Sequence, residues 1–111
     1  MRRIAGSGLL LAGLVLLAGC APDEGDLQEE FDAFVAGANK CAMASECAEI
    51  APGCPLGCFV AVRADRKAAA EAKARELIER YSRWGKNCQY DCASHGPLAC
   101  IEGRCGFEPE K

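Results

Sequence analysis

The chain has 111 residues, of which nine are cysteines, and a formal net charge of −3. This length allows one small domain at most. Sixteen acidic side chains outnumber thirteen basic ones, which excludes the basic composition of a general nucleic-acid binder.

The chain begins with a positive segment and an apolar stretch that ends at a cysteine. Arg2 and Arg3 precede the stretch, which closes with Leu17-Ala18-Gly19-Cys20. The uncharged run from residue 4 to residue 18 is shorter than the roughly 20 residues that a bilayer-spanning helix needs. Small residues before the cysteine suit a signal peptidase. The pattern resembles the lipobox of bacterial lipoprotein signal peptides.

This resemblance implies that residues 1–19 are a removed signal peptide and that Cys20 becomes a lipidated N-terminus. One acyl chain anchors a protein marginally, whereas a lipoprotein cysteine carries a diacylglyceryl group and an amide-linked acyl chain such as palmitate. We therefore expect permanent membrane attachment through these acyl chains. Ala21 stands where an inner-membrane retention signal would have aspartate. It points to the outer membrane, with the protein facing the periplasm.

The remaining chain has few residues from which to build a core. Without Arg2 and Arg3 the net charge is −5, and 18 large apolar residues follow Cys20. Chains this short rarely reach more than ~3–5 kcal/mol of stability without cross-links. An even number of cysteines in an exported chain predicts four disulfides, each worth ~2–4 kcal/mol, with the pairing left open among 105 possibilities. The predicted disulfide-forming residues are Cys41, Cys47, Cys54, Cys58, Cys88, Cys92, Cys100 and Cys105.

A first helix is predicted from about Leu27 to Ala38, where apolar residues recur at helical spacing. Asp26 and Glu29 have the spacing of a capping box. Residues 20–26 are then a tether, and residues 27–108 form one cysteine-rich domain. The six acidic residues of 23–32 are expected on a solvated face, with a cation site as the alternative.

Two short strands, Cys47–Ala51 and Cys58–Arg63, are predicted on either side of a turn rich in proline and glycine. The turn contains Pro55, Leu56 and Gly57 between two cysteines. Small protease inhibitors present such rigid loops to their targets, and rigidity lowers the ordering cost of binding. These three residues are therefore a possible binding loop with Leu56 as its anchor. The alternative is that Leu56 packs inward.

A long second helix is predicted from Asp65 to Trp84, because alanines and straight side chains dominate without glycine or proline. Asp65 is its expected cap. Its expected apolar stripe consists of Ala70, Ala74, Leu77, Tyr81 and Trp84. Its expected i,i+4 ion pairs are Glu71–Arg75, Glu76–Arg80 and Glu79–Arg83.

A loop at residues 87–97 holds the only histidine, His95, and precedes a predicted hairpin of Leu98–Ile101 and Arg104–Phe107. Gly103 supplies the positive φ that a two-residue turn needs. The predicted fold class is therefore α+β: a small disulfide-rich domain with two short β-hairpins packed with a long central helix, plus an N-terminal helix.

No recognisable catalytic, metal or cofactor motif accompanies these elements. Neither closely spaced cysteine pair has the C-x-x-C spacing of redox and zinc sites. We expect no metal and no cofactor, and we expect His95 to be an ordinary surface-loop residue. A small envelope enzyme that uses His95 as its base is the alternative.

The cysteine pattern resembles a set of eight-cysteine bacterial lipoproteins and secreted proteins without assigned biochemistry. The resemblance depends on Cys54-Pro55-Leu56-Gly57-Cys58, on Cys88-x3-Cys92 and on Cys100-x4-Cys105. The prediction is a lipid-anchored cell-envelope protein with a non-catalytic binding or scaffolding role. Its partner would be an envelope protein or peptidoglycan, and not a nucleic acid. The alternatives are an inhibitor-like module and the enzyme.

Overall fold

A computed structural model describes residues 23–110. The predicted signal peptide and the predicted lipidation of Cys20 lie outside these residues. The described part contains α1 (Glu24–Ala36), β1 (Cys47–Ile50), β2 (Val60–Arg63), α2 (Lys67–Ser82), β3 (Leu98–Ile101) and β4 (Arg104–Phe107). With two small antiparallel sheets and four disulfides, the predicted α+β class is confirmed. Within residues 23–110, no helix has both the length and the apolar character needed to cross a membrane.

The first helix begins three residues earlier than predicted. Asp23 has an extended backbone, and its carboxylate accepts a hydrogen bond from the Gly25 amide at 3.3 Å, so Asp23 is the cap and not Asp26. Asp26 lies in the first turn, where a negative charge suits the helix dipole. Only three residues therefore separate Cys20 from the first helical residue.

The second helix also starts differently from the prediction. A 3-10 turn, η2 (Ala64–Arg66), precedes it, and Asp65 forms an ion pair with Arg63 at 3.0 Å instead of capping the helix. The stripe is buried at Ala70, Ala74, Leu77 and Tyr81. Trp84 was wrongly placed in it: the helix ends at Ser82, and Trp84 is 49% exposed.

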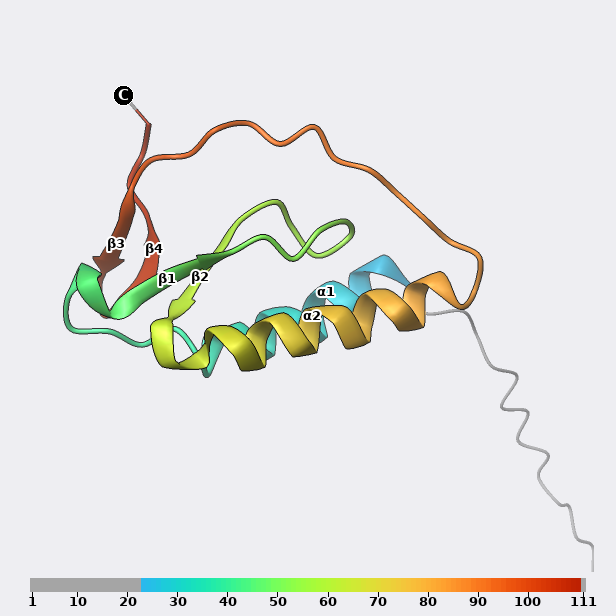
Figure 1. Cartoon of the computed structure of the whole chain (residues 1–111), viewed down its shortest axis with the longest axis horizontal. Coiled ribbons are helices and arrows are strands. Elements are labelled where there is room, and N and C mark those ends of the chain that lie inside the picture. Colours follow the sequence, from blue (N-terminus) through green and yellow to red (C-terminus); the bar gives the residue numbers. More distant parts are fainter. Residues whose placement is uncertain (1–22, 111) are drawn as a thin grey trace, which may run out of the picture.

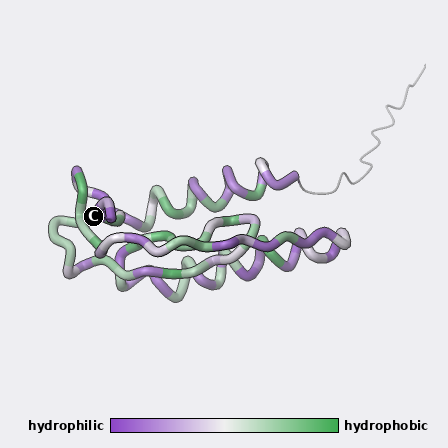
Figure 2. Tube along the Cα trace, turned by 90° about the horizontal axis from the view of Figure 1, so that it is seen from above, coloured by the Kyte–Doolittle hydropathy of each residue, from purple (hydrophilic) through white to green (hydrophobic). Residues whose placement is uncertain are grey.

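An ion-pair network joins the two helices along their length. Glu30 of α1 binds Lys73 at 2.8 Å and Arg80 at 3.1 Å, and Glu76 binds the same two cations at 3.5 and 2.9 Å. Hydrogen bonds from Lys73 and Arg80 lower the pKa of Glu30. Of the three i,i+4 pairs predicted on this helix, only Glu76–Arg80 forms in the described part of the chain. The helices run antiparallel, with hydrophilic and hydrophobic residues alternating along each (Figure 2).

The first hairpin buries both of its faces because strand side chains alternate between faces. Its register pairs Cys47 with Arg63 and Ile50 with Val60. Ile50 and Val62 face the helices and join their core, whereas Cys47 and Ala61 face the second hairpin. The first hairpin is therefore a middle layer between the helix pair and the second hairpin (Figure 1).

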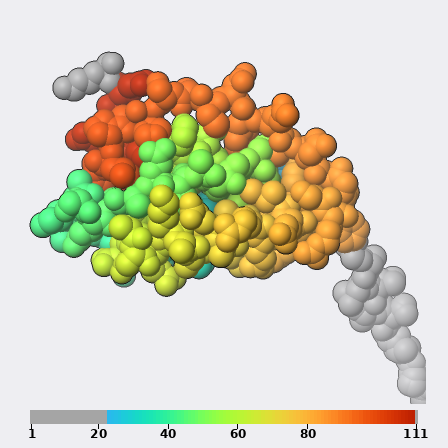
Figure 3. All heavy atoms as spheres, in the orientation of Figure 1, coloured from blue at the N-terminus to red at the C-terminus, as the bar shows by residue number. Residues whose placement is uncertain are grey.

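The second hairpin has the two-residue turn that the sequence predicts. Glu102 has a φ of 53° and Gly103 a φ of 79°, the left-handed pair that a tight hairpin turn requires. The chain after α1 pairs with its outer edge, because Lys40 forms a bridge with Arg104 and the Cys105 amide donates to the Asn39 carbonyl at 2.7 Å. Figure 3 shows this hairpin, in red, stacked against the green first hairpin.

The main core lies between the helices and the first hairpin, and it includes the turn of that hairpin. Phe31, Leu77 and Val62 are fully buried, and Leu56 is only 2% exposed. The Leu56 carbonyl also accepts a hydrogen bond from Gln28 of α1 at 3.2 Å. Leu56 therefore packs inward, which is the second of the two alternatives that the sequence left open.

Replacing Leu56 by alanine should lower the free energy of unfolding by about 2–5 kcal/mol, because the change leaves a cavity in the core. Urea denaturation followed by circular dichroism measures this loss. The matched control is Ile101→Ala at a side chain that is 44% exposed, for which we expect a change within about 0.5 kcal/mol. Equal effects of the two substitutions would contradict the position of Leu56.

Candidate functional site

The predicted disulfides form in two sets, and each set joins the first half of the domain to the second. Cys54–Cys88 and Cys58–Cys92 attach the turn of the first hairpin to the long loop after α2. Cys41–Cys100 and Cys47–Cys105 attach the first hairpin and the segment before it to the second hairpin. All eight cysteines of the described chain are thus bonded to one another.

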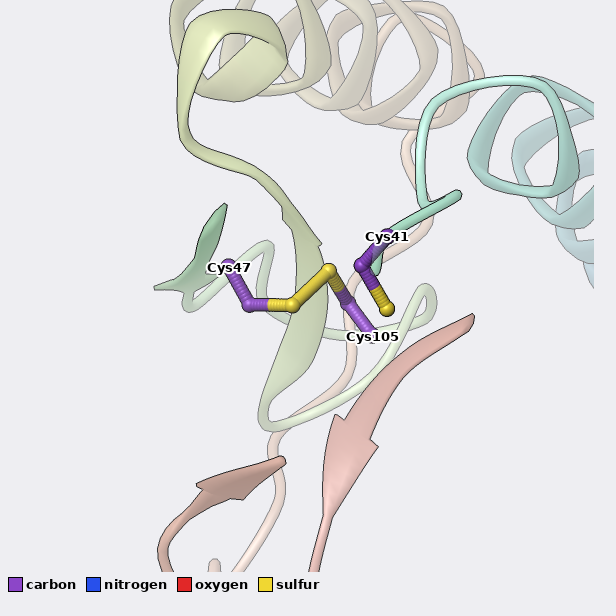
Figure 4. A group of neighbouring side chains, drawn as sticks. All are labelled: Cys41, Cys47 and Cys105. Carbon is purple, nitrogen blue, oxygen red and sulfur yellow. A yellow bond between two sulfur atoms is a disulfide. The ribbon is translucent and has the colours of Figure 1, made fainter. Parts of the chain in front are cut away.

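Three of these sulfur atoms are grouped closely enough to hold a metal. The Sγ atoms of Cys41, Cys47 and Cys105 lie within 4.8 Å of one another (Figure 4). Metals bind cysteine as the thiolate, and each of these sulfurs is in a disulfide. The group is therefore two disulfides in contact, brought together because Cys100 and Cys105 are opposite each other in the second hairpin.

A hollow of about 350 Å³ lies beside the other two disulfides. We call it the disulfide hollow. Its walls include Cys54, Cys58, Phe59, Cys88, Tyr90 and Cys92. Tyr90 is 45% exposed at its rim. Apolar and aromatic walls of this kind can hold an apolar group.

His95 lies in a second arrangement, which also includes Phe59. Its ring is 4.5 Å from the Phe59 ring and 4.3 Å from the Phe107 ring, measured between centroids. Nε2 is 3.1 Å from the Glu49 carboxylate, and Nδ1 is 2.6 Å from the Gly96 carbonyl oxygen. The side chain lies in a loop, as expected, and is 29% exposed, but the sequence did not predict its contacts with Glu49, Phe59 and Phe107. We call His95, Glu49, Phe59 and Phe107 the histidine box.

His95 lies next to Glu49 because side chains alternate between the faces of a strand and because the backbone of the loop packs closely on another segment. Glu49 is on the face of β1 that also carries Cys47, which is the face turned toward the second hairpin. Gly96 is buried, and a Cβ atom there would overlap the carbonyl oxygen of Glu108. The loop can therefore pass close to the C-terminal segment and bring His95 over Glu49. Sequence spacing alone carries no signal for this long-range pair.

The Gly96 carbonyl and the Glu49 carboxylate are both hydrogen-bond acceptors. The two hydrogen bonds can therefore form together only when both ring nitrogens of His95 carry a proton. The Gly96 carbonyl and the Glu49 carboxylate accordingly raise the pKa of His95 above its ordinary value, with a further contribution from Glu110. The neighbouring Ser94 hydroxyl donates to Glu110 at 2.6 Å. The arrangement favours a structural imidazolium, held between two aromatic rings.

The possible binding loop is only partly accessible. Pro55 and Leu56 are buried, and Gly57 is half-buried at a φ of 141°. Gly53 and Gly57 form a bridge that closes the turn. Leu56 therefore does not project as an anchor for a protease.

Scans against protein-family models, curated proteins and solved structures found no match to this chain.

The histidine box should make the stability of the protein depend on pH. The raised pKa of His95 contributes stability that is complete below the unfolded value of about 6.5 and is lost as pH rises through the folded value. Urea midpoints between about pH 5.5 and pH 8.5 should fall with pH in the wild type relative to His95→Gln, which has no titrating ring. Glu49→Gln retains the Gly96 bond and should give a smaller slope than the wild type. Parallel curves for wild type and H95Q would contradict this assignment.

Proposed function

We propose that this protein is a lipid-anchored protein of the bacterial cell envelope with a binding or scaffolding role. Acyl chains on Cys20 would hold it at the membrane, with the domain in the periplasm on the inner face of the outer membrane. One observation carries the proposal: the eight cysteines that follow Cys20 are all paired with one another. None of the eight cysteines in residues 23–110 therefore remains to pair with Cys20, the position that the lipobox assigns to the lipid.

The disulfides also support an exported location. Four structural disulfides are expected in a small domain of an oxidising compartment and are rare in the cytosol. The apolar core is small, so the domain depends on these cross-links for stability. The same chain in a reducing compartment would lose that support.

A non-catalytic role agrees with the chemistry of the one histidine. Each ring nitrogen of His95 has an acceptor of its own, and Ser94 donates its hydroxyl to Glu110. The ring is thus occupied as a structural group and not aimed at a nucleophile. Rigid surfaces fixed by cross-links suit binding, because little order remains to be gained in a complex. The partner would be an envelope protein or peptidoglycan.

The inhibitor-like alternative receives no such support. It required Leu56 as an exposed anchor, and Leu56 is buried against the helices. We therefore do not propose it.

The proposed anchor predicts the mass and the thiol content of the protein. Expressed in a bacterium that processes lipoproteins, the mature chain should begin at Cys20, carry the added acyl mass and contain no free thiol. Intact mass spectrometry of the denatured, unreduced protein after alkylation measures all three. Cys20→Ser should abolish acylation and leave the four disulfides intact, whereas Cys100→Ser should retain the lipid and expose a thiol.

Three results would contradict the proposal. They are an unprocessed N-terminus, a processed chain without acyl mass, and several alkylated cysteines in the wild type. Cross-linking in intact cells followed by purification of the acylated protein then identifies a partner, with Cys20→Ser as the control for membrane placement.

A further inference from the structure

One end of the helix pair gathers the start of the described chain and two exposed aromatic rings. The Tyr81 hydroxyl donates to the Glu24 carboxylate at 2.7 Å, so the start of α1 lies beside the end of α2. Trp84 lies three residues after Tyr81, and its amide donates a hydrogen bond to the Tyr81 carbonyl at 3.2 Å. Figure 1 shows the blue start of α1 behind the orange end of α2. We call this end, formed by residues 23–24 and 83–90, the tether end.

The aromatic rings of the tether end are exposed. Trp84 is 49% exposed and Tyr90 is 45% exposed, and both lie in the segment that follows α2. Tyr90 is near enough to Tyr81 to influence its pKa, which is raised mainly by the hydrogen bond to Glu24. Tryptophan and tyrosine are enriched where a protein meets the headgroup layer of a membrane, because their rings have an apolar body and a polar edge.

The length of chain outside the structure limits what can cover this end. Cys20 and Asp23 are three residues apart, which spans at most about 11 Å when fully extended. A lipidated Cys20 lies at the membrane interface, so the start of α1 must lie within that distance of it. The 16 residues of α2 extend about 24 Å, so the opposite end of the helix pair can lie far beyond this reach.

We propose that the tether end is a membrane-contact surface, on which Trp84 and Tyr90 lie in the headgroup layer beside the lipidated N-terminus. This inference rests on the proposed lipid anchor. The anchor alone would leave the domain free to turn about its tether, whereas the aromatic contact gives it one orientation. The helix pair then points away from the bilayer, and the second hairpin, at the opposite end of the molecule (Figure 1), is directed toward the periplasm.

The charges of the tether end select the kind of lipid surface. Asp23 and Glu24 contribute negative charge, and Arg83 and Lys86 contribute positive charge. Mixed signs fit a zwitterionic headgroup layer, which offers both ammonium and phosphate groups. A strongly anionic surface would repel the acidic first turn of α1.

The test uses Trp84, the only tryptophan of the chain. The acylated protein is reconstituted into phosphatidylcholine vesicles in which part of the lipid is brominated near the headgroup end of its chains. Tryptophan rings at the interface are within reach of this quencher, so about half of the Trp84 emission should be lost relative to unbrominated vesicles.

The control moves the tryptophan to the opposite end of the molecule. Met43 is 58% exposed and precedes the 3-10 turn η1 (Ala44–Glu46), which lies at the other end of the helix pair. The double variant Trp84→Phe/Met43→Trp should show little quenching in the same vesicles. Near-UV circular dichroism and flotation check that this variant remains folded and membrane-bound.

Flotation separates the two proposals. Protein that does not float with the vesicles contradicts the lipid anchor. Protein that floats without quenching of Trp84, or with equal quenching at both tryptophan positions, retains the anchor and overturns the membrane-contact surface. Quenching confined to Trp84 supports it.

Discussion

The pairing of the cysteines is the constraint on which the rest of this structure depends. Every disulfide joins residues 41–58 to residues 88–105, and the closed loops span 34, 34, 58 and 59 residues. Loops of this length restrict the unfolded chain by several kcal/mol each in the chain-entropy description. The second hairpin adds little to the main core, which is built by the helices and the first hairpin. Its position is instead fixed through Cys41, Cys47 and the small cluster around Ala61.

This arrangement explains how a domain with few large apolar residues can still position side chains accurately. The first hairpin gives one face to the helices and the other face to the second hairpin, so Glu49 points toward the loop that carries His95. The two disulfides of that loop hold it along the hairpin turn and form the walls of the disulfide hollow. A structural imidazolium and an aromatic hollow thus arise from the same cross-linked layer, with Phe59 contributing to both.

Local features of the fold were predictable because they depend on neighbours in the sequence. The two short segments on either side of a turn with Gly103 predicted the second hairpin, and the spacing of Ala70, Ala74 and Leu77 predicted the buried stripe of α2. Contacts between distant segments were not predictable. Nothing in the sequence indicated that Glu30 forms bridges to Lys73 and Arg80, which are 43 and 50 residues away. The His95–Glu49 pair is separated by 46 residues, and the disulfide connectivity was one of many equal choices.

Because the cross-links make the domain rigid, contact of one end with the membrane would fix the position of every other surface. A short tether fixes only where the domain starts, and a flexible domain could bring any of its surfaces to the lipid. Here the antiparallel helices are joined by the Glu30 network, the first hairpin is packed on them, and the second hairpin is bonded to the first. The body therefore turns as a unit. If the rings of Trp84 and Tyr90 lie in the headgroup layer, the position of the hairpins relative to the bilayer follows from the geometry of the body. A partner in the periplasm would then meet one defined face.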